Sequence, residues 1–280
     1  MGAHRSDEGS LPHPPSSSQD PEEGLPITAE HRGPTGRGER VTGRPASAVL
    51  PAPLRGRLGL VAALAAPVVA VIGVLYAGHS RPGRVDRWVI RPTADSVRPP
   101  WRYVALALDF LGEPVGAVML VVAAVAGCLL LRRPRAAVLV VSGAALTVGT
   151  ATLLKSLVGR TIHGDGNLSY PSGHTAFATA LAFVVALLAT DRLGLGRTAG
   201  TSLVLAAALV AGAAMGWAQV ALGAHYPTDV LGGWCTALAV MPPTAWLVDR
   251  TADRRADRTA DRRADRMVDG TADAGRREHR

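Results

Sequence analysis

Six long runs of the chain contain no charged residue and are mainly apolar. Uncharged apolar runs of about 18 residues or more are typical of membrane-spanning helices, because a helix satisfies its own backbone hydrogen bonds in lipid. A simple soluble globular protein is therefore excluded. The runs cover residues 58–78, 114–131, 136–154, 175–190, 198–224 and 230–248.

The length of these runs fits a bilayer. At a rise of about 1.5 Å per residue, most of them span a hydrocarbon core of about 30 Å, and the short run 175–190 must extend into its flanks. The segment 101–112 (WRYVALALDFLG) is amphipathic and predicts an interfacial helix that leads into the second span. We therefore predict an all-α fold, a polytopic membrane protein with a six-transmembrane-helix bundle over residues 56–249.

Most of the charge lies in two polar tails. Residues 1–55 are rich in Pro, Ser, Gly, Glu and Arg without periodicity, which predicts a disordered tail that carries no signal peptide. Residues 250–280 are rich in Arg and Asp and repeat the octapeptide TADRRADR. We expect a solvated tail there, partly helical or disordered, and contact with the anionic inner leaflet is the alternative.

Arginines in the short loops predict the orientation of the bundle. They precede the first span and follow the second, fourth and sixth, so the positive-inside rule assigns these ends and both termini to the cytoplasm. The loop 79–102 also carries six arginines but faces outward in this topology. Despite a formal net charge of +8, no nucleic-acid binding is predicted, because the arginines lie in tails and membrane-flanking loops.

Three polar clusters fall at outer ends of the predicted spans. They cover residues 155–160 (KSLVGR), 170–174 (YPSGH) and 225–229 (HYPTD). Lys155 is the only lysine among 30 basic residues, which indicates a position where a compact ammonium is favoured. Lys155 and Arg160 supply cations for a phosphate group, and the alternative is a pair of charges that snorkel at the end of a span.

The PSGH sequence has the composition of an anion site at the start of a helix. Ser172 is a good N-cap, and the backbone N–H groups that follow it, together with the helix dipole, attract an anion. Gly173 permits close approach to the backbone, and His174 lies in the first turn next to that anion. The alternative is a capped helix start with a surface histidine.

The HYPTD sequence predicts an activated histidine. Pro227 fits the first turn of a helix, and His225 and Asp229 are four residues apart, so one turn brings the carboxylate to the imidazole. A carboxylate on one ring nitrogen fixes the tautomer and leaves the other nitrogen free to attack an electrophile. The alternative is an ordinary His–Asp pair at the membrane interface.

In this order and on matching helix ends, the three clusters resemble the motifs of the type-2 phosphatidic acid phosphatase (PAP2) superfamily, in its membrane lipid phosphatase branch. The resemblance covers about residues 58–248 and implies an outward-facing site that hydrolyses phosphate esters without a metal or cofactor. The residues that carry it are Lys155, Pro171, Ser172, Gly173, His174, His225 and Asp229.

The resemblance also implies a role for each motif residue. His225 would attack phosphorus and form a phosphohistidine, oriented by Asp229, and His174 would protonate the leaving oxygen. The phosphate oxygens would be bound by Lys155, Ser172 and the backbone amide of Gly173.

The chain departs from the family pattern at two positions. Ile162 and Gln219 stand where the family has phosphate-binding arginines. A charge-assisted hydrogen bond contributes about 1.5–3 kcal/mol, so two uncompensated losses cost about 3–6 kcal/mol, or on the order of 10²- to 10⁴-fold in rate. We expect Arg160 to substitute in part, with His163 and Gln219 as auxiliary donors.

These features predict an integral-membrane phosphatase that acts on a lipid phosphate or diphosphate in the bilayer, such as polyprenyl diphosphate, phosphatidic acid or phosphatidylglycerol phosphate. One alternative is a lipid-phosphate binding or transport protein that keeps the fold without turnover, because two arginines are missing. Another is a metal-dependent hydrolase, although the spacing of its histidines lacks a paired-histidine helix motif. The ligands in that alternative are His163, His174, His225 and Asp229. Haloperoxidase chemistry is disfavoured by the membrane spans.

Overall fold

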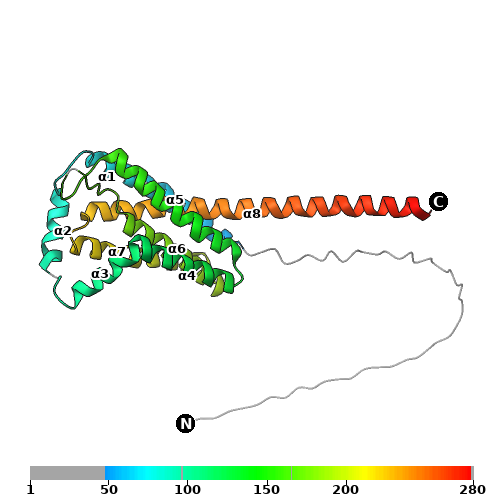
Figure 1. Cartoon of the computed structure of the whole chain (residues 1–280), viewed down its shortest axis with the longest axis horizontal. Coiled ribbons are helices and arrows are strands. Elements are labelled where there is room, and N and C mark those ends of the chain that lie inside the picture. The colour runs from blue at the N-terminus through cyan, green and yellow to red at the C-terminus, as the bar shows by residue number, and fades with distance from the viewer. Residues whose placement is uncertain (1–47, 96, 165, 279–280) are drawn as a thin grey trace, which may run out of the picture. The chain divides into compact units, whose positions relative to one another are not determined.

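The computed structural model describes residues 48–95, 97–164 and 166–278 (Figure 1). Residues 1–47 of the predicted N-terminal tail lie outside this range. Apart from an isolated bridge between Thr161 and Leu168, the described residues are helical or irregular. The elements are η1 (Ala52–Leu54), α1 (Arg55–Leu75), α2 (Arg84–Asp95), α3 (Trp101–Gly112), α4 (Pro114–Leu130), α5 (Pro134–Val158), α6 (Gly173–Arg192), α7 (Arg197–Ala221) and α8 (Pro227–Glu278).

Five helical segments are long and apolar enough to cross a membrane: Ala52–Leu75, α5, α6, α7 and the first part of α8. Helices α3 and α4 pass the same test only as a pair, which is bent by 70° and makes a sixth span if it is counted as one. The bend falls at Glu113, whose backbone is extended, and Pro114 lacks the N–H that would continue α3. The predicted all-α, polytopic membrane fold is confirmed.

Large apolar side chains lie on the outer surface of the bundle as well as inside it. Leu64 on α1 and Val118 on α4 are 61% and 62% exposed, whereas Phe183 and Leu187 on α6 are fully buried. Such exposed side chains are costly in water, but lipid tails solvate them as well as a protein core does. The surface of the bundle therefore fits a bilayer environment.

Helices α6 and α8 begin close together at one end of the bundle. A Cβ atom on Gly233 would overlap the carbonyl oxygen of Ser172, so glycine is needed for α8 to approach the start of α6 this closely. The backbone amide of Ser172 donates a hydrogen bond of 2.9 Å to the carbonyl oxygen of Asp229. These contacts join the second and third polar clusters.

The opposite end of the bundle is closed by Asp249. This carboxylate is 2% exposed and accepts hydrogen bonds from the backbone amides of Val49 and Leu50 at 2.8 and 2.9 Å. Arg135 lies 3.7 Å from it and also pairs with Asp253 at 2.8 Å. Residues 48–55, which the sequence prediction places in the tail, thus pack against the bundle.

The C-terminal tail continues α8 as one helix to Glu278 (Figure 1). Residues 253–266 of this helix are all exposed. The octapeptide repeat is rich in Ala and Arg, which favour helix, and it places Arg and Asp three residues apart, where opposite charges stabilise a helix. The structure therefore favours the helical alternative for this segment.

Candidate active site

The three predicted polar clusters converge at the end of the bundle where α6 and α8 begin. Lys155 lies in the last turn of α5 and interacts electrostatically with Asp229 of α8. His174, in the first turn of α6, interacts with both Lys155 and His225. Residues far apart in the sequence thus share one site, as their predicted positions at the outer ends of the spans require.

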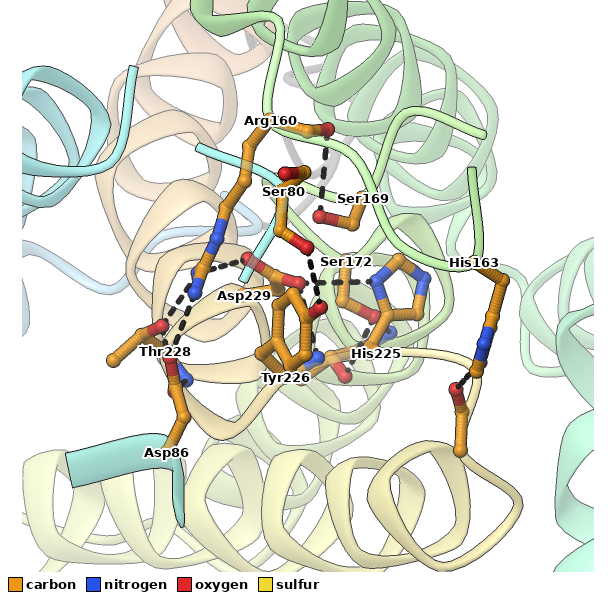
Figure 2. A network of polar contacts seen from close by, with 12 residues as sticks. Ser80, Asp86, Arg160, His163, Ser169, Ser172, His225, Tyr226, Thr228 and Asp229 are labelled. Atoms are coloured by element: carbon orange, nitrogen blue, oxygen red, sulfur yellow. Dashed lines mark hydrogen bonds and ion pairs between the residues drawn. The ribbon is translucent and has the colours of Figure 1, made fainter. Parts of the chain in front are cut away.

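Arg160 forms the centre of a buried network beside this site (Figure 2). One terminal nitrogen, Nη1, donates to Asp229 Oδ1 and to Thr228 Oγ1, each at 2.6 Å, and Nη2 donates to Asp86 Oδ2 at 2.7 Å. The guanidinium carbon lies 4.1 Å from the ring centroid of Tyr76. The side chain is 0% exposed, so Arg160 joins α5, α2 and α8 away from solvent.

This placement differs from the role predicted for Arg160. The sequence predicts that its guanidinium binds a phosphate oxygen, but the structure pairs both terminal nitrogens with carboxylates. The second carboxylate, Asp86, is 74 residues away in the sequence, so no local spacing indicates it. The geometry favours a positioning role, in which Arg160 holds Asp229.

Asp86 explains how the arginine-rich loop 79–102 is attached to the bundle. Its Oδ1 accepts from the backbone amide and the hydroxyl of Thr228 at 2.9 and 2.8 Å, and its Oδ2 accepts from the amide of Gly83 at 2.9 Å. Burial by itself would raise the pKa of Asp86, but the hydrogen bonds from Thr228, Gly83 and Arg160 outweigh it and hold this pKa below the usual 3.8. An ionised carboxylate at the start of α8 is also favoured by the helix dipole.

His225 and Asp229 lie next to each other, as their spacing predicts. Nδ1 of His225 is 3.8 Å from Oδ2 of Asp229 and is a buried atom without a hydrogen bond to any described residue. The same Oδ2 accepts from the backbone amide of Tyr226 at 3.0 Å, so Asp229 folds back over the start of α8. A shift of about 1 Å would form the His–Asp hydrogen bond, and catalytic hydrogen bonds commonly tighten when substrate binds.

His174 faces two acidic residues that lie outside the three polar clusters predicted from the sequence. Its Nε2 lies 3.6 Å from Asp109 Oδ1 and 3.6 Å from Glu113 Oε1, on either side of the α3–α4 bend. Gln219 donates from its side-chain amide to Asp109 Oδ1 at 2.7 Å. The signal for these acids is their spacing of four residues at the end of the amphipathic segment.

Among the described residues, Asp109, Glu113 and His174 bring potential metal-ligating atoms close together. One atom each from Asp109, Glu113 and His174 lie within 4.8 Å of one another, and this set could hold a metal ion. It shares only His174 with the four ligands that the metal-dependent alternative requires. Nearby, Gln219 occupies a position where the family has arginine, and it binds a carboxylate rather than facing the site as a free donor.

The predicted phosphate-binding residues differ in exposure and in whether their polar atoms are already hydrogen-bonded. Lys155 is half-buried and has no hydrogen bond or ion pair to a described residue. Ser172 is the N-cap of α6, and its Oγ accepts from the amide and hydroxyl of Thr175 at 3.4 and 3.1 Å. Gly173 has open space where a Cβ would be, so its backbone can be approached. His163 is exposed, and its Nε2 lies 2.8 Å from the carbonyl oxygen of Gly223.

Gly112 sets the position of the His174 ring. A Cβ atom at this glycine would overlap Cδ2 and Cγ of His174. We expect Gly112→Ala to displace the ring and to lower kcat/KM of a reaction that uses His174 by about 10²-fold, because displacements near 1 Å have effects of that size. Gly149→Ala, with nothing near the added Cβ, is the matched control. Wild-type kcat/KM in Gly112→Ala would contradict a catalytic position for His174.

Comparisons with known proteins concern the family and the fold of this chain. A family model described as the PAP2 superfamily matches residues 117–252. No curated protein matches the sequence significantly. A similar solved structure is the transmembrane PAP2 type phosphatidylglycerolphosphate phosphatase from Bacillus subtilis, with a TM-score of 0.50 and 20% identity over 69% of this chain and 96% of that chain. At this identity the likeness shows a shared fold.

Proposed function

Because residues 117–252 carry a PAP2-superfamily domain, we propose that this chain is an integral-membrane phosphatase that hydrolyses a lipid phosphate or diphosphate. The observation that carries the proposal is the convergence of Lys155, His174 and the His225–Asp229 pair at one end of a bundle of apolar helices. A cation, a general acid and an oriented nucleophile are the groups that phosphoryl transfer requires.

In the first step, Nε2 of His225 attacks phosphorus and forms the P–N bond of a phosphohistidine. The bond from phosphorus to the leaving oxygen breaks, and the imidazolium of His174 donates its proton to that oxygen. In the second step, neutral His174 accepts a proton from water, which attacks phosphorus and displaces His225. Inorganic phosphate leaves, and both histidines regain their starting states.

The surrounding residues support this chemistry in different ways. Asp229 faces Nδ1 of His225 and stabilises the positive charge that develops on the ring, and Arg160 holds Asp229 in place. Lys155 and the first backbone amides of α6, including that of Gly173, bind the phosphate oxygens. Asp109 and Glu113 lie 3.6 Å from Nε2 of His174 and are placed to orient its ring.

The proposed location follows from the charges at the two ends of the bundle. Arg133 and Arg135 lie at the end opposite the site, where they pair with Asp191 at 2.6 Å and with Asp253 at 2.8 Å. The positive-inside rule assigns that end to the cytoplasm. The active site then faces the extracytoplasmic side, and the C-terminal helix lies in the cytoplasm.

The alternative function is a lipid-phosphate binding or transport protein without efficient turnover. It is supported by Ile162, which is 5% exposed, and by Gln219, which is committed to Asp109. Neither residue supplies the positive charge of an arginine. Two acidic side chains beside His174 also make the site less favourable for a phosphate group.

Phosphate release by the detergent-purified protein tests the proposal. The substrates are polyprenyl diphosphate, phosphatidic acid and phosphatidylglycerol phosphate, each with and without EDTA. We expect release that persists in EDTA and falls by at least about 10³-fold in His225→Ala, because the covalent route is lost. Release from sealed right-side-out vesicles to which substrate is added outside tests the orientation. A folded protein that binds these lipids and releases no phosphate would favour the alternative.

A further inference from the structure

An apolar groove begins beside the candidate active site. The part of the groove nearest the site, called the upper cavity, has a volume of about 380 Å³ and lies between α3, α4, α6 and α7. Leu108 and Leu111, which line it, flank Asp109 on α3, and Phe177 is one turn after His174 on α6. The mouth of this cavity is therefore adjacent to the acidic side of His174.

A second cavity of about 350 Å³ continues the first one along α4 and α6. Both cavities are lined by Ala124, Leu181 and Val185, so they meet along one face of the bundle. The second cavity ends at Leu131 and Arg192, where the guanidinium of Arg192 donates to the carbonyl oxygen of Leu131 at 3.4 Å. This contact lies at the end of the groove that is remote from the site.

Small residues leave space in the second cavity, which is called the lower cavity because it is farther from the site. In membrane proteins glycine and alanine usually allow two helices to approach each other closely. Gly127 of α4 does not have that role, because a Cβ atom added to it would meet nothing within 4 Å. It lines the second cavity together with Ala124. The space in front of these residues is therefore available to a ligand.

The groove is longer than one membrane leaflet. Phe177 and Arg192 are 15 residues apart on α6, which corresponds to about 22 Å. Each leaflet contributes about 15 Å to the hydrocarbon core, and the acyl chains of a glycerophospholipid end near its middle. A chain that fills the groove from the site to Arg192 must cross the middle of the bilayer.

We propose that this groove binds the hydrocarbon chain of the substrate and selects a single chain longer than one leaflet, of the polyprenyl type. The inference rests on the proposed function, since the chain belongs to the lipid phosphate that is hydrolysed. The two cavities form a single groove through their shared lining residues, so we expect a lipid with two chains to leave one of them outside it. Nearly all of its lining side chains are apolar, which suits a hydrocarbon.

Substitutions at different depths in the groove test whether it selects substrates by the length of their hydrocarbon chain. Gly127→Phe fills only the lower cavity, and Ala124→Trp blocks the junction of the two cavities. Ala126→Trp, on an exposed face of the same helix outside both cavities, is the matched control. The substrates are farnesyl diphosphate, undecaprenyl diphosphate and a diacyl phosphatidic acid.

We expect Gly127→Phe to lower kcat/KM for undecaprenyl diphosphate by about 10-fold or more and to leave farnesyl diphosphate unchanged, because only the longer chain reaches the lower cavity. Ala124→Trp should impair both, and Ala126→Trp neither. Equal effects of the three variants, a loss for both prenyl substrates in Gly127→Phe, or preferred hydrolysis of phosphatidic acid would overturn the proposal.

Binding separates this inference from the proposed function. If wild-type protein releases no phosphate, the affinity for undecaprenyl diphosphate is measured by native mass spectrometry in detergent. Binding that weakens about 10-fold in Gly127→Phe and not in Ala126→Trp supports the groove even though the phosphatase proposal fails. Equal affinity in both variants overturns the groove.

Discussion

Replacing Arg160 by methionine is expected to lower the free energy of unfolding by about 3–5 kcal/mol, because removing one member of a buried ion network leaves the others unpaired. Asp86 and Asp229 would both remain buried without the cation that lies between them. The stacking of the guanidinium against the rings of Tyr76 and Tyr226 would also be lost. Thermal and denaturant unfolding in one detergent measure the effect.

Arg84→Met is the control for this substitution. Arg84 lies at the start of α2, in the same arginine-rich loop, but it is exposed. Its replacement should leave the unfolding transition close to that of the wild type. An Arg160→Met protein as stable as the wild type would contradict the prediction and would mean that the network contributes little to the free energy of unfolding.

Asp229→Asn is expected to lower kcat for phosphate release by about 10³- to 10⁴-fold, because the residue that faces His225 Nδ1 would no longer carry the charge that stabilises the imidazolium. The result depends on the proposed function. The substitution also removes a charge from the Arg160 network, so a structural effect must be distinguished from a catalytic one.

Asp86→Asn makes that distinction. Asp86 pairs with the same guanidinium at nearly the same distance, 2.7 Å compared with 2.6 Å for Asp229, but the structure shows no contact between Asp86 and His225. Both variants should lose stability, and only Asp229→Asn should lose most of its kcat. Similar kcat values in the two variants would show that Asp229 acts through the network rather than through His225.

Neither Arg160 nor Gln219 replaces the two arginines that the family pattern has and this chain lacks. Arg160 lies two residues before Ile162, yet its guanidinium points into the network with Asp86 and Asp229. Gln219 binds Asp109 beside His174. Lys155, the remaining predicted phosphate ligand with a cationic side chain, has no hydrogen bond or ion pair to a described residue, and two carboxylates lie beside His174. A substrate that gains much of its affinity from its hydrocarbon chain suits such a site.

Local patterns in the sequence were sufficient for the helices and for the motif residues. The helix predicted over residues 114–131 is observed as Pro114–Leu130, and the segment 101–112 is observed as the helix Trp101–Gly112. The prediction that 114–131 spans the membrane by itself differs from the structure, in which these two helices pass the test for a span only as a bent pair. The pairing of His225 with Asp229 and the N-cap role of Ser172 follow from spacings of a few residues. The sequence leaves helix and disorder open beyond residue 250, where the structure continues α8, because an isolated polar repeat is only marginally helical.

The amino-acid pattern alone predicts a bundle of membrane helices with three polar clusters at one end. In lipid a backbone must satisfy its own hydrogen bonds, so uncharged runs of sufficient length leave helix as the available structure. The partners of Arg160 and His174 and the path of the apolar groove follow from the tertiary structure alone. Those contacts join residues that are far apart in the sequence, such as Asp109 with His174 and Asp86 with Arg160, and they depend on how the helices pack.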